Sequence, residues 1–179
     1  MVMATDEKQW TIEALHRLPD DGNKYELVRG ELFVTPAPRA GHELILARLT
    51  RLLVPYVTTH ELGMIFHPRA VVRFDGSEVE PDLMVRDPQS LREADWDAAS
   101  QPSLVVEVLS KTTRRRDLGP KRVLYLDAGI PEYWVVDEDR QSVRVIKPDI
   151  PDAVTTDELQ WMPAGAREAL VFDVALLFL

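Results

Sequence analysis

The sequence LVVEVLSKTTRRRDLGPKRVLYLDAGIPEYWVVD, residues 104–137, decides the fold. Residues 103–109, at the start of this stretch, are the most strand-like run in the chain. We predict that they lie at the centre of a sheet. Residues 118–128 are predicted to form a helix, because Pro120 suits a first helical position and Gly129 suits the stop. A further strand follows the helix. Together with the elements on either side, this order indicates a mixed α/β fold.

Helices and hairpins are expected in the rest of the chain. Helical spacing predicts one helix over residues 11–18, with Thr11 as its N-cap, and another over residues 41–56. Two strand-like segments flank Arg29 and Gly30 and predict a tight β-hairpin. The other strands are expected at residues 64–67, 69–74, 79–85, 132–137 and 142–147. The first two of these are interpreted as a second hairpin, and the last two as a third.

Composition restricts the class of protein. The chain has 179 residues, 45% of them apolar and 28% charged, which is typical of one globular domain over residues 1–179. It contains no cysteine, so zinc–thiolate clusters and thiol nucleophiles are excluded, and a metal must be bound by oxygen or imidazole. The amino terminus does not resemble a secretory signal, and apolar residues 171–179 are too few to span a bilayer. We therefore expect a cytoplasmic protein with no membrane partner.

The distribution of charge points to a polyanionic partner. The formal net charge is −9, which counts against nucleic acid as a partner, because phosphate binding usually needs a basic surface. Basic residues nevertheless gather within twelve positions of the chain: Lys111, Arg114, Arg115, Arg116, Lys121 and Arg122. Only one acid, Asp117, lies among them. A polyanion therefore has one obvious place to bind.

Glu107 is an unusual residue for a buried strand. Alternate residues of a strand share a face, so Glu107 lies between Val105 and Leu109 on a largely apolar surface. An ionised carboxylate there is costly unless a cation, a metal ion or several hydrogen-bond donors compensate it. One interpretation is a structural salt bridge to Arg114 or Arg116. The other is a functional site.

Asp82 is a second carboxylate in a favourable position. It follows Pro81 directly and is expected at the mouth of the strand that it begins. A Pro-Asp pair by itself is more often a turn or a capping residue. Two carboxylates on neighbouring strands, however, can share a hard divalent cation such as Mg²⁺, which prefers oxygen ligands.

Lys121 is the third candidate residue. Helical spacing puts it on the same face as Leu124 and Tyr125, at the head of the stripe that packs onto the sheet. A lysine in this position often extends to solvent. Alternatively, its ammonium reaches the two carboxylates, where it could orient a water molecule or neutralise developing phosphate charge.

Three other residues receive weaker interpretations. His42 lies on the apolar face near the start of its helix, where a core histidine with satisfied hydrogen bonds is the simpler interpretation. Glu26 and Glu31 belong to the first hairpin and are interpreted as ordinary surface acids unless that hairpin folds over the site.

These motifs resemble a known group of enzymes. Pro81-Asp82 followed by Glu107 in VVEVLS is similar to the PD-(D/E)XK nuclease superfamily. YELVRGEL, PDLMV and the stretch 104–137, in this order, resemble the bacterial Uma-two family, labelled as restriction endonucleases; the resemblance covers residues 11–148. It implies a restriction-endonuclease-like core, a central mixed sheet flanked by helices, here with an added N-terminal hairpin. Leu109 stands where the superfamily has its lysine, and the family motif instead carries a lysine that maps onto Lys121.

The resemblance implies a metal-dependent endonuclease that hydrolyses phosphodiester bonds, most simply those of DNA. Asp82 and Glu107 would bind Mg²⁺ or Mn²⁺, and Lys121 would stabilise charge at the attacked phosphate. His42 and Glu31 would line the site. The nucleic-acid backbone would be positioned by Arg114, Arg115 and Arg116.

A homodimer is expected for two reasons. Cleavage of a two-fold symmetric duplex favours paired sites, and the apolar residues 174–179 could be buried against a partner.

Two alternatives stay open. A catalytically inactive nuclease-like module for binding or regulation would explain Leu109 and the acidic surface. A glycoside hydrolase with Asp82 and Glu107 as its acid and base would need aromatic side chains near both acids, and the sequence offers none there.

Overall fold

A computed structural model describes residues 9–87, 96, 100–110 and 113–179. Lys111, the first member of the basic cluster, lies outside the described residues.

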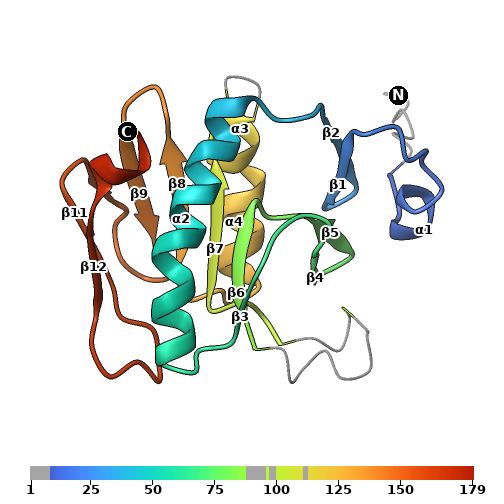
Figure 1. Ribbon diagram of the computed structural model, residues 1–179. Coiled ribbons are helices and arrows are strands. Elements are labelled where there is room, and N and C mark those ends of the chain that lie inside the picture. Colours follow the sequence, from blue (N-terminus) through green and yellow to red (C-terminus); the bar gives the residue numbers. More distant parts are fainter. Residues whose placement is uncertain (1–8, 88–95, 97–99, 111–112) are drawn as a thin grey trace.

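A six-stranded mixed sheet forms the centre of the molecule (Figure 1). Its strands follow the order β10 (Ala153–Thr155), β9 (Ser142–Ile146), β8 (Tyr133–Asp137), β7 (Leu104–Val108), β6 (Leu83–Arg86), β3 (Met64–Phe66). Among the strand pairs of the described residues, β7–β8 alone is parallel, as expected for two strands joined through a helical crossover. The prediction that residues 103–109 lie at the centre of the sheet is confirmed, and so is the β8–β9 hairpin.

A second sheet contains the predicted N-terminal hairpin. Its order is β2 (Glu31–Thr35), β1 (Lys24–Val28), β5 (Ser77–Val79), β4 (Val72–Phe74). The turn between β1 and β2 has positive φ at Arg29 and at Gly30, the conformation of a two-residue hairpin loop. The predicted pairing of residues 64–67 with 69–74 is wrong, because β3 pairs with β6 and β4 pairs with β5 in the other sheet. Periodicity predicts that both segments are strands, but it does not predict which strands they pair with.

Helices cover the two faces of the large sheet. In Figure 1, α2 (Ala40–Thr59) crosses one face, while α3 (Arg114–Asp117) and α4 (Pro120–Asp127) lie on the other side of β7. Pro120 begins α4 and Gly129 follows its end with a positive φ, as predicted. The short helix α1 (Ile12–Leu15) is capped by the Thr11 side chain, as also predicted.

The core consists of two clusters, one on each face of the large sheet. Leu104, Val106 and Val108 of β7 point into the cluster beneath α2. Val105 and Leu109 point into the other, which also contains side chains of α4 and of the second sheet. The alternation predicted for β7 is therefore confirmed, and it puts Glu107 on the face that α4 and the second sheet cover.

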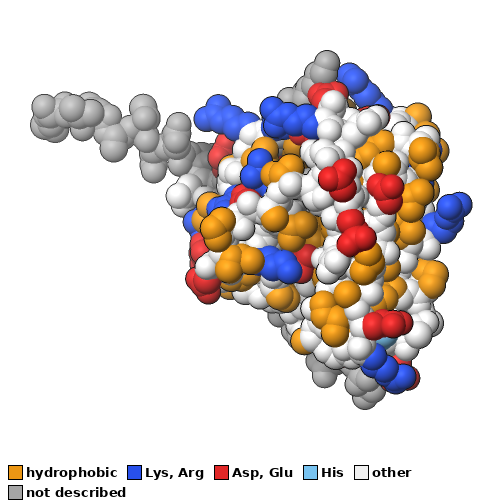
Figure 2. Space-filling view, turned by 90° about the vertical axis from the view of Figure 1, so that its left-hand side faces the viewer, with side chains coloured by type: hydrophobic (Ala, Val, Ile, Leu, Met, Phe, Trp, Pro, Cys, Tyr) orange, Lys and Arg blue, Asp and Glu red, His pale blue; other side chains and the backbone are white. Residues whose placement is uncertain are grey.

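The carboxyl-terminal segment packs against its own chain. It contains β11 (Glu158–Trp161), β12 (Leu170–Asp173) and the 3₁₀ helix η2 (Val174–Leu177). Val174 and Leu177 are buried in the cluster beneath α2, so the expectation that residues 174–179 are reserved for a partner is wrong for these two side chains. Figure 2 shows the side of the molecule that carries β11 and β12, where hydrophobic side chains alternate with acidic ones. Among the described residues, no helix combines the length and the apolar character that crossing a membrane requires.

Candidate active site

Asp82 lies at the start of β6 with both carboxylate oxygens engaged. Oδ1 accepts a hydrogen bond from Lys24 Nζ at 3.0 Å. Oδ2 accepts from the backbone N–H of Val108 at 2.9 Å and lies 3.0 Å from Nε2 of His42. Burial alone would raise the pKa of Asp82, but the charge of Lys24 and the hydrogen bond from His42 hold it well below its usual range. Asp82 is therefore an ionised carboxylate at neutral pH.

Glu107 lies on the adjacent strand β7 and is paired with Lys121. Its Oε1 forms an ion pair with the Lys121 ammonium and accepts a hydrogen bond from the hydroxyl of Tyr125 at 2.7 Å. Glu107 is only 1% exposed, and burial raises its pKa to about 7 although the Lys121 charge acts in the opposite direction. The predicted proximity of Lys121 to the Glu107 carboxylate is present in the structure, and the interpretation of Lys121 as a solvent-extended lysine is wrong, since it is fully buried.

Glu26 is not a surface acid; the exception allowed for in the sequence, that the first hairpin folds over the site, is the one observed. Its side chain is completely buried, because β1 packs over the face of the large sheet that carries Glu107. Lys121 Nζ lies 2.8 Å from Oε1, and an Arg116 guanidinium nitrogen lies 3.1 Å from Oε2. Burial opposes ionisation, but Lys121, Lys24 and Arg116 together lower the pKa of Glu26 to about 2. Lys121 therefore serves two buried carboxylates, from β1 and from β7.

Lys24 is the residue that sequence reasoning missed. It lies on β1 two positions before Glu26, so both side chains leave the strand on the same face. Its ammonium donates to the carbonyl of Glu80 as well as to Asp82, both at 3.0 Å. Burial would lower the pKa of Lys24, but the charges of Glu26, Asp82 and Glu107 outweigh it and raise the pKa. The alternation of residues 24–28 predicts that Lys24 and Glu26 share a face of the strand. It does not predict that this face is covered, because that depends on how the second sheet packs.

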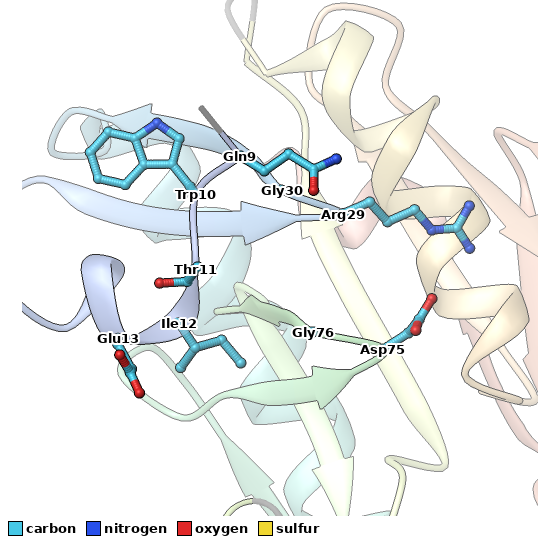
Figure 3. Close-up of a pocket in the computed structure, with 9 residues that line it drawn as sticks. All are labelled: Gln9, Trp10, Thr11, Ile12, Glu13, Arg29, Gly30, Asp75 and Gly76. Atoms are coloured by element: carbon cyan, nitrogen blue, oxygen red, sulfur yellow. The ribbon is translucent and has the colours of Figure 1, made fainter. Parts of the chain in front are cut away.

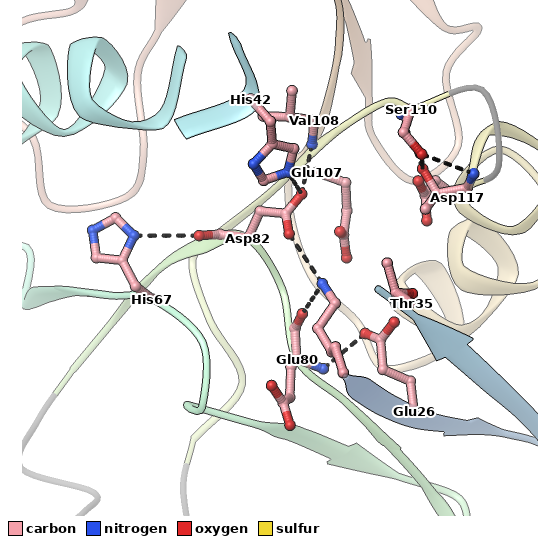
Figure 4. A network of polar contacts seen from close by, with 12 residues as sticks. Glu26, Thr35, His42, His67, Glu80, Asp82, Glu107, Val108, Ser110 and Asp117 are labelled. Carbon is pink, nitrogen blue, oxygen red and sulfur yellow. Dashed lines mark hydrogen bonds and ion pairs between the residues drawn. The ribbon is translucent and has the colours of Figure 1, made fainter. Parts of the chain in front are cut away.

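Asp82, His42 and Lys24 line one pocket of about 840 Å³. Its walls come from the β2–α2 loop, the start of α2, the segment before β6 and the end of β7. The ionisable side chains in its lining are Lys24, Arg39, His42, Glu43, His67, Arg69, Glu80, Asp82, Arg116, Asp117, Glu138 and Asp139. Figure 4 shows His42 and His67 approaching Asp82 from different sides, with Glu80 and Glu26 beyond it. Glu107 and Lys121 are not part of the lining and lie beneath it.

Glu80 supplies a further carboxylate to this pocket. It is 9% exposed, and burial raises its pKa. Its Oε1 lies 3.5 Å from the guanidinium of Arg69, whereas Oε2 has no hydrogen-bond partner within the part of the chain that the structure describes. The pocket thus contains a buried acid with unused acceptor capacity next to Asp82.

The two supporting residues occupy different places. His42 lines the pocket and contacts Asp82, and its other ring nitrogen lies 3.2 Å from Glu43. Burial would lower the pKa of His42, but the hydrogen bond and charge of Asp82 raise it. Glu31, expected beside His42, is exposed at the start of β2 and is not in the pocket lining.

The three arginines point in different directions. Arg114 pairs with Asp137 at 2.8 Å, Arg115 is exposed, and Arg116 is buried between Glu26 and Asp117. Arg116 therefore departs from the expected role of a free phosphate-binding side chain, because its charge is used to compensate buried carboxylates.

A second hollow, of about 930 Å³, lies between α1 and the turns of the second sheet (Figure 3). Its charged lining residues, Glu13, Arg29 and Asp75, are all exposed. Exposed charged side chains are common on protein surfaces and do not by themselves indicate a reaction in this hollow.

The donor atoms around Asp82 are of the type that a hard divalent cation prefers. The Lys24 ammonium already occupies a position between the Asp82 carboxylate and the Glu80 carbonyl, so these oxygens accept a cation. Among the described residues, no three side chains of His, Cys, Asp or Glu converge on one point as a metal site. The residues fit a metal ion at Asp82 only if it takes the place of that ammonium.

Comparison with known proteins identifies the family. The model of the Uma2 family, described as "Putative restriction endonuclease", matches residues 12–174. The chain belongs to the Uma2 family. The resemblance inferred from residues 81–85 and 104–137 is thereby confirmed, and with it a nuclease-like class of protein.

A solved structure also shares the Uma2 fold. It is a "putative nuclease belonging to DUF820" from Anabaena variabilis, with a TM-score of 0.79 and 21% sequence identity. The alignment covers 94% of this chain and 97% of the other. This likeness supports the restriction-endonuclease-like fold expected from the sequence. No protein with a curated description matches the chain significantly.

Proposed function

We propose that this Uma2 protein is a metal-dependent endonuclease that hydrolyses phosphodiester bonds of nucleic acid, with DNA as the first substrate to test. One observation carries the proposal: two buried carboxylates, Asp82 and Glu107, lie at the adjoining strands β6 and β7, and the ionised Asp82 lines a pocket that contains basic as well as acidic side chains. The family description supports the same class of reaction.

The residues would divide the work as follows. Asp82 and Glu107 would hold Mg²⁺ or Mn²⁺, which when bound activates water and neutralises phosphate charge. Val108 N–H and His42 fix the orientation of the Asp82 carboxylate. Lys121 is a positioning residue, because it is enclosed between Glu26 and Glu107 and keeps the Glu107 side chain in place.

The proposed reaction is the hydrolysis of one phosphodiester bond. The oxygen of one water molecule bonds to phosphorus while the bond from phosphorus to one ester oxygen breaks. One water proton ends on the released hydroxyl group, and the other passes to solvent. Of the arginines, Arg114 and Arg115 are proposed to guide the nucleic-acid backbone, since Arg115 is exposed and Arg114 is partly so.

Cleavage of supercoiled plasmid tests this proposal. We expect nicking with Mg²⁺ or Mn²⁺ that a chelator abolishes and that falls about a hundredfold or more in Asp82→Asn and Glu107→Gln. Glu132→Gln is the matched control, because Glu132 is equally buried and paired but does not line the pocket. Wild-type protein that leaves plasmid, single-stranded DNA and RNA intact with both metals would refute the proposal.

One observation favours a second candidate, the nuclease-like binding module without turnover. Both oxygens of Asp82 already have partners, and Glu107 is paired with Lys121 and Tyr125. Such a module would bind nucleic acid with salt-dependent affinity that survives Asp82→Asn. A filter-binding titration of that variant, alongside the cleavage assay, separates the two candidates.

A homodimer and a cytoplasmic location stay predictions from the sequence. Sedimentation of the protein with and without duplex DNA tests the first.

A further inference from the structure

We propose that Lys24, rather than Lys121, is the lysine that contacts the substrate phosphate, and that its ammonium holds the cation position at Asp82 until a metal ion binds there. This inference rests on the proposed function and names a residue of the same site.

Accessibility separates the two lysines. The Lys121 side chain is fully buried, and its ammonium is shared by Glu26 and Glu107. To reach a phosphate it would have to leave buried Glu107 without its paired cation and Glu26 with Arg116 alone, which is strongly unfavourable. The Lys24 side chain is 15% exposed and lines the pocket beside Asp82. Of the two, only Lys24 can meet a ligand in the pocket without breaking the buried cluster.

The backbone around Lys24 directs its ammonium to this position. Lys24, Glu26 and Val28 lie on one face of β1. Val28 is anchored in the core cluster beneath α4, and Glu26 is fixed by Lys121 and Arg116. The strand therefore holds the Lys24 side chain against the start of β6, with its end in the pocket.

Competition with a metal ion follows from the contacts of Lys24. Its ammonium lies 3.0 Å from Asp82 Oδ1 and 3.0 Å from the Glu80 carbonyl oxygen, both of which are hard oxygen donors. A divalent cation at Asp82 and this ammonium cannot share one carboxylate oxygen at contact distance, because they repel each other. The flexible four-carbon stem lets the displaced ammonium turn into the pocket, where it could contact a bound phosphate.

Calorimetric titration with Mn²⁺ tests the competition without any need for activity. Lys24→Met should bind Mn²⁺ at least tenfold more tightly than wild type, whereas Lys24→Arg, which keeps the charge, should stay within about threefold. Lys147→Met is the matched control, because Lys147 forms a comparable 2.9 Å ion pair with buried Glu132 away from the pocket. Equal Mn²⁺ affinity in Lys24→Met and wild type, or binding in neither, would overturn the inference.

Plasmid cleavage tests the phosphate contact. At saturating Mn²⁺, Lys24→Met and Lys24→Gln should lose about a hundredfold or more in kcat, and Lys24→Arg should recover part of that loss. Glutamine can still donate to Asp82, so it keeps the test valid if the methionine variant unfolds. Wild-type cleavage that both variants match would refute the role of Lys24 and leave the proposed function standing. Absence of cleavage by wild type would instead refute the proposed function.

Discussion

Replacement of Lys121 by methionine should lower the free energy of unfolding, by an amount that depends on pH. Methionine keeps most of the length and volume of the lysine stem but removes the ammonium. Glu26 then keeps Arg116 as its cation at 3.1 Å, whereas Glu107 keeps only the Tyr125 hydroxyl at 2.7 Å among its closest partners. Glu107 is therefore the carboxylate that loses most.

The magnitude follows from burial and linkage. Removing one partner of a buried ion pair costs about 3–5 kcal/mol, because the other charge is left uncompensated. Glu107 can reduce this cost by binding a proton, which removes its charge. Burial already raises its pKa to about 7, and loss of Lys121 raises it further. A carboxyl group whose pKa is higher in the folded state than in the unfolded state stabilises the fold at pH values below the unfolded pKa. This stabilisation is lost as pH rises through the folded pKa. At 1.36 kcal/mol per unit, the 1.5 units from pH 7 to pH 8.5 add about 2 kcal/mol to the cost.

Urea unfolding at pH 6 and pH 8.5 measures this effect. Lys121→Met should lose about 3–5 kcal/mol at pH 8.5 and about 1–3 kcal/mol at pH 6. Lys147→Met, whose side chain is 38% exposed, should lose no more than about 1 kcal/mol at either pH. Adding Glu107→Gln to the Lys121 variant should remove the difference between the two pH values. A loss equal to that of the Lys147 control, or one that shrinks at high pH, would refute the reasoning.

Three further outcomes are expected. Leu49→Ala should lower the free energy of unfolding by about 2–5 kcal/mol in urea titration, because Leu49 is a fully buried residue of α2 in the core cluster; a loss under 1 kcal/mol would contradict the assigned core. Gly63→Ala should lower the melting temperature at a cost of about 1–3 kcal/mol, since φ is +115° there and a Cβ would overlap the Arg86 carbonyl; an unchanged melting temperature would contradict this. His42→Gln should cost more stability at pH 6 than at pH 9, because a histidine pKa raised by Asp82 stabilises the fold below its unfolded pKa and this gain is lost as pH rises; urea titrations with equal losses at both pH values would count against it.

The sequence predicts correctly those helices and strands whose bounds and faces depend on neighbouring residues in the chain. Pro120 and Gly129 define the ends of α4 whatever surrounds the helix, and strict alternation sorts the side chains of β7 onto two faces. For the same reason, the pairing of Glu107 with a lysine on the next helix could be inferred from spacing. A single domain over residues 1–179 stays a prediction.

Tertiary packing decided the residues that the sequence could not place. Lys24 and Glu26 differ from ordinary surface residues only because the second sheet covers the large one. The arginine run suggested one basic surface, but a helix rotates about 100° per residue, so Arg114 and Arg116 face different partners.

The buried cluster joins parts of the chain that are far apart in sequence. Glu26 and Lys121 are separated by 95 residues, and Lys24 and Asp82 by 58. Contacts of such long range form only after distant segments have met, so they belong to the slow steps of folding. A growing chain on the ribosome lacks the shared ammonium of Lys121 until both sheets can dock. A chain that ends before Lys121 therefore lacks the cation that pairs with Glu107 and cannot complete the cluster beneath the pocket.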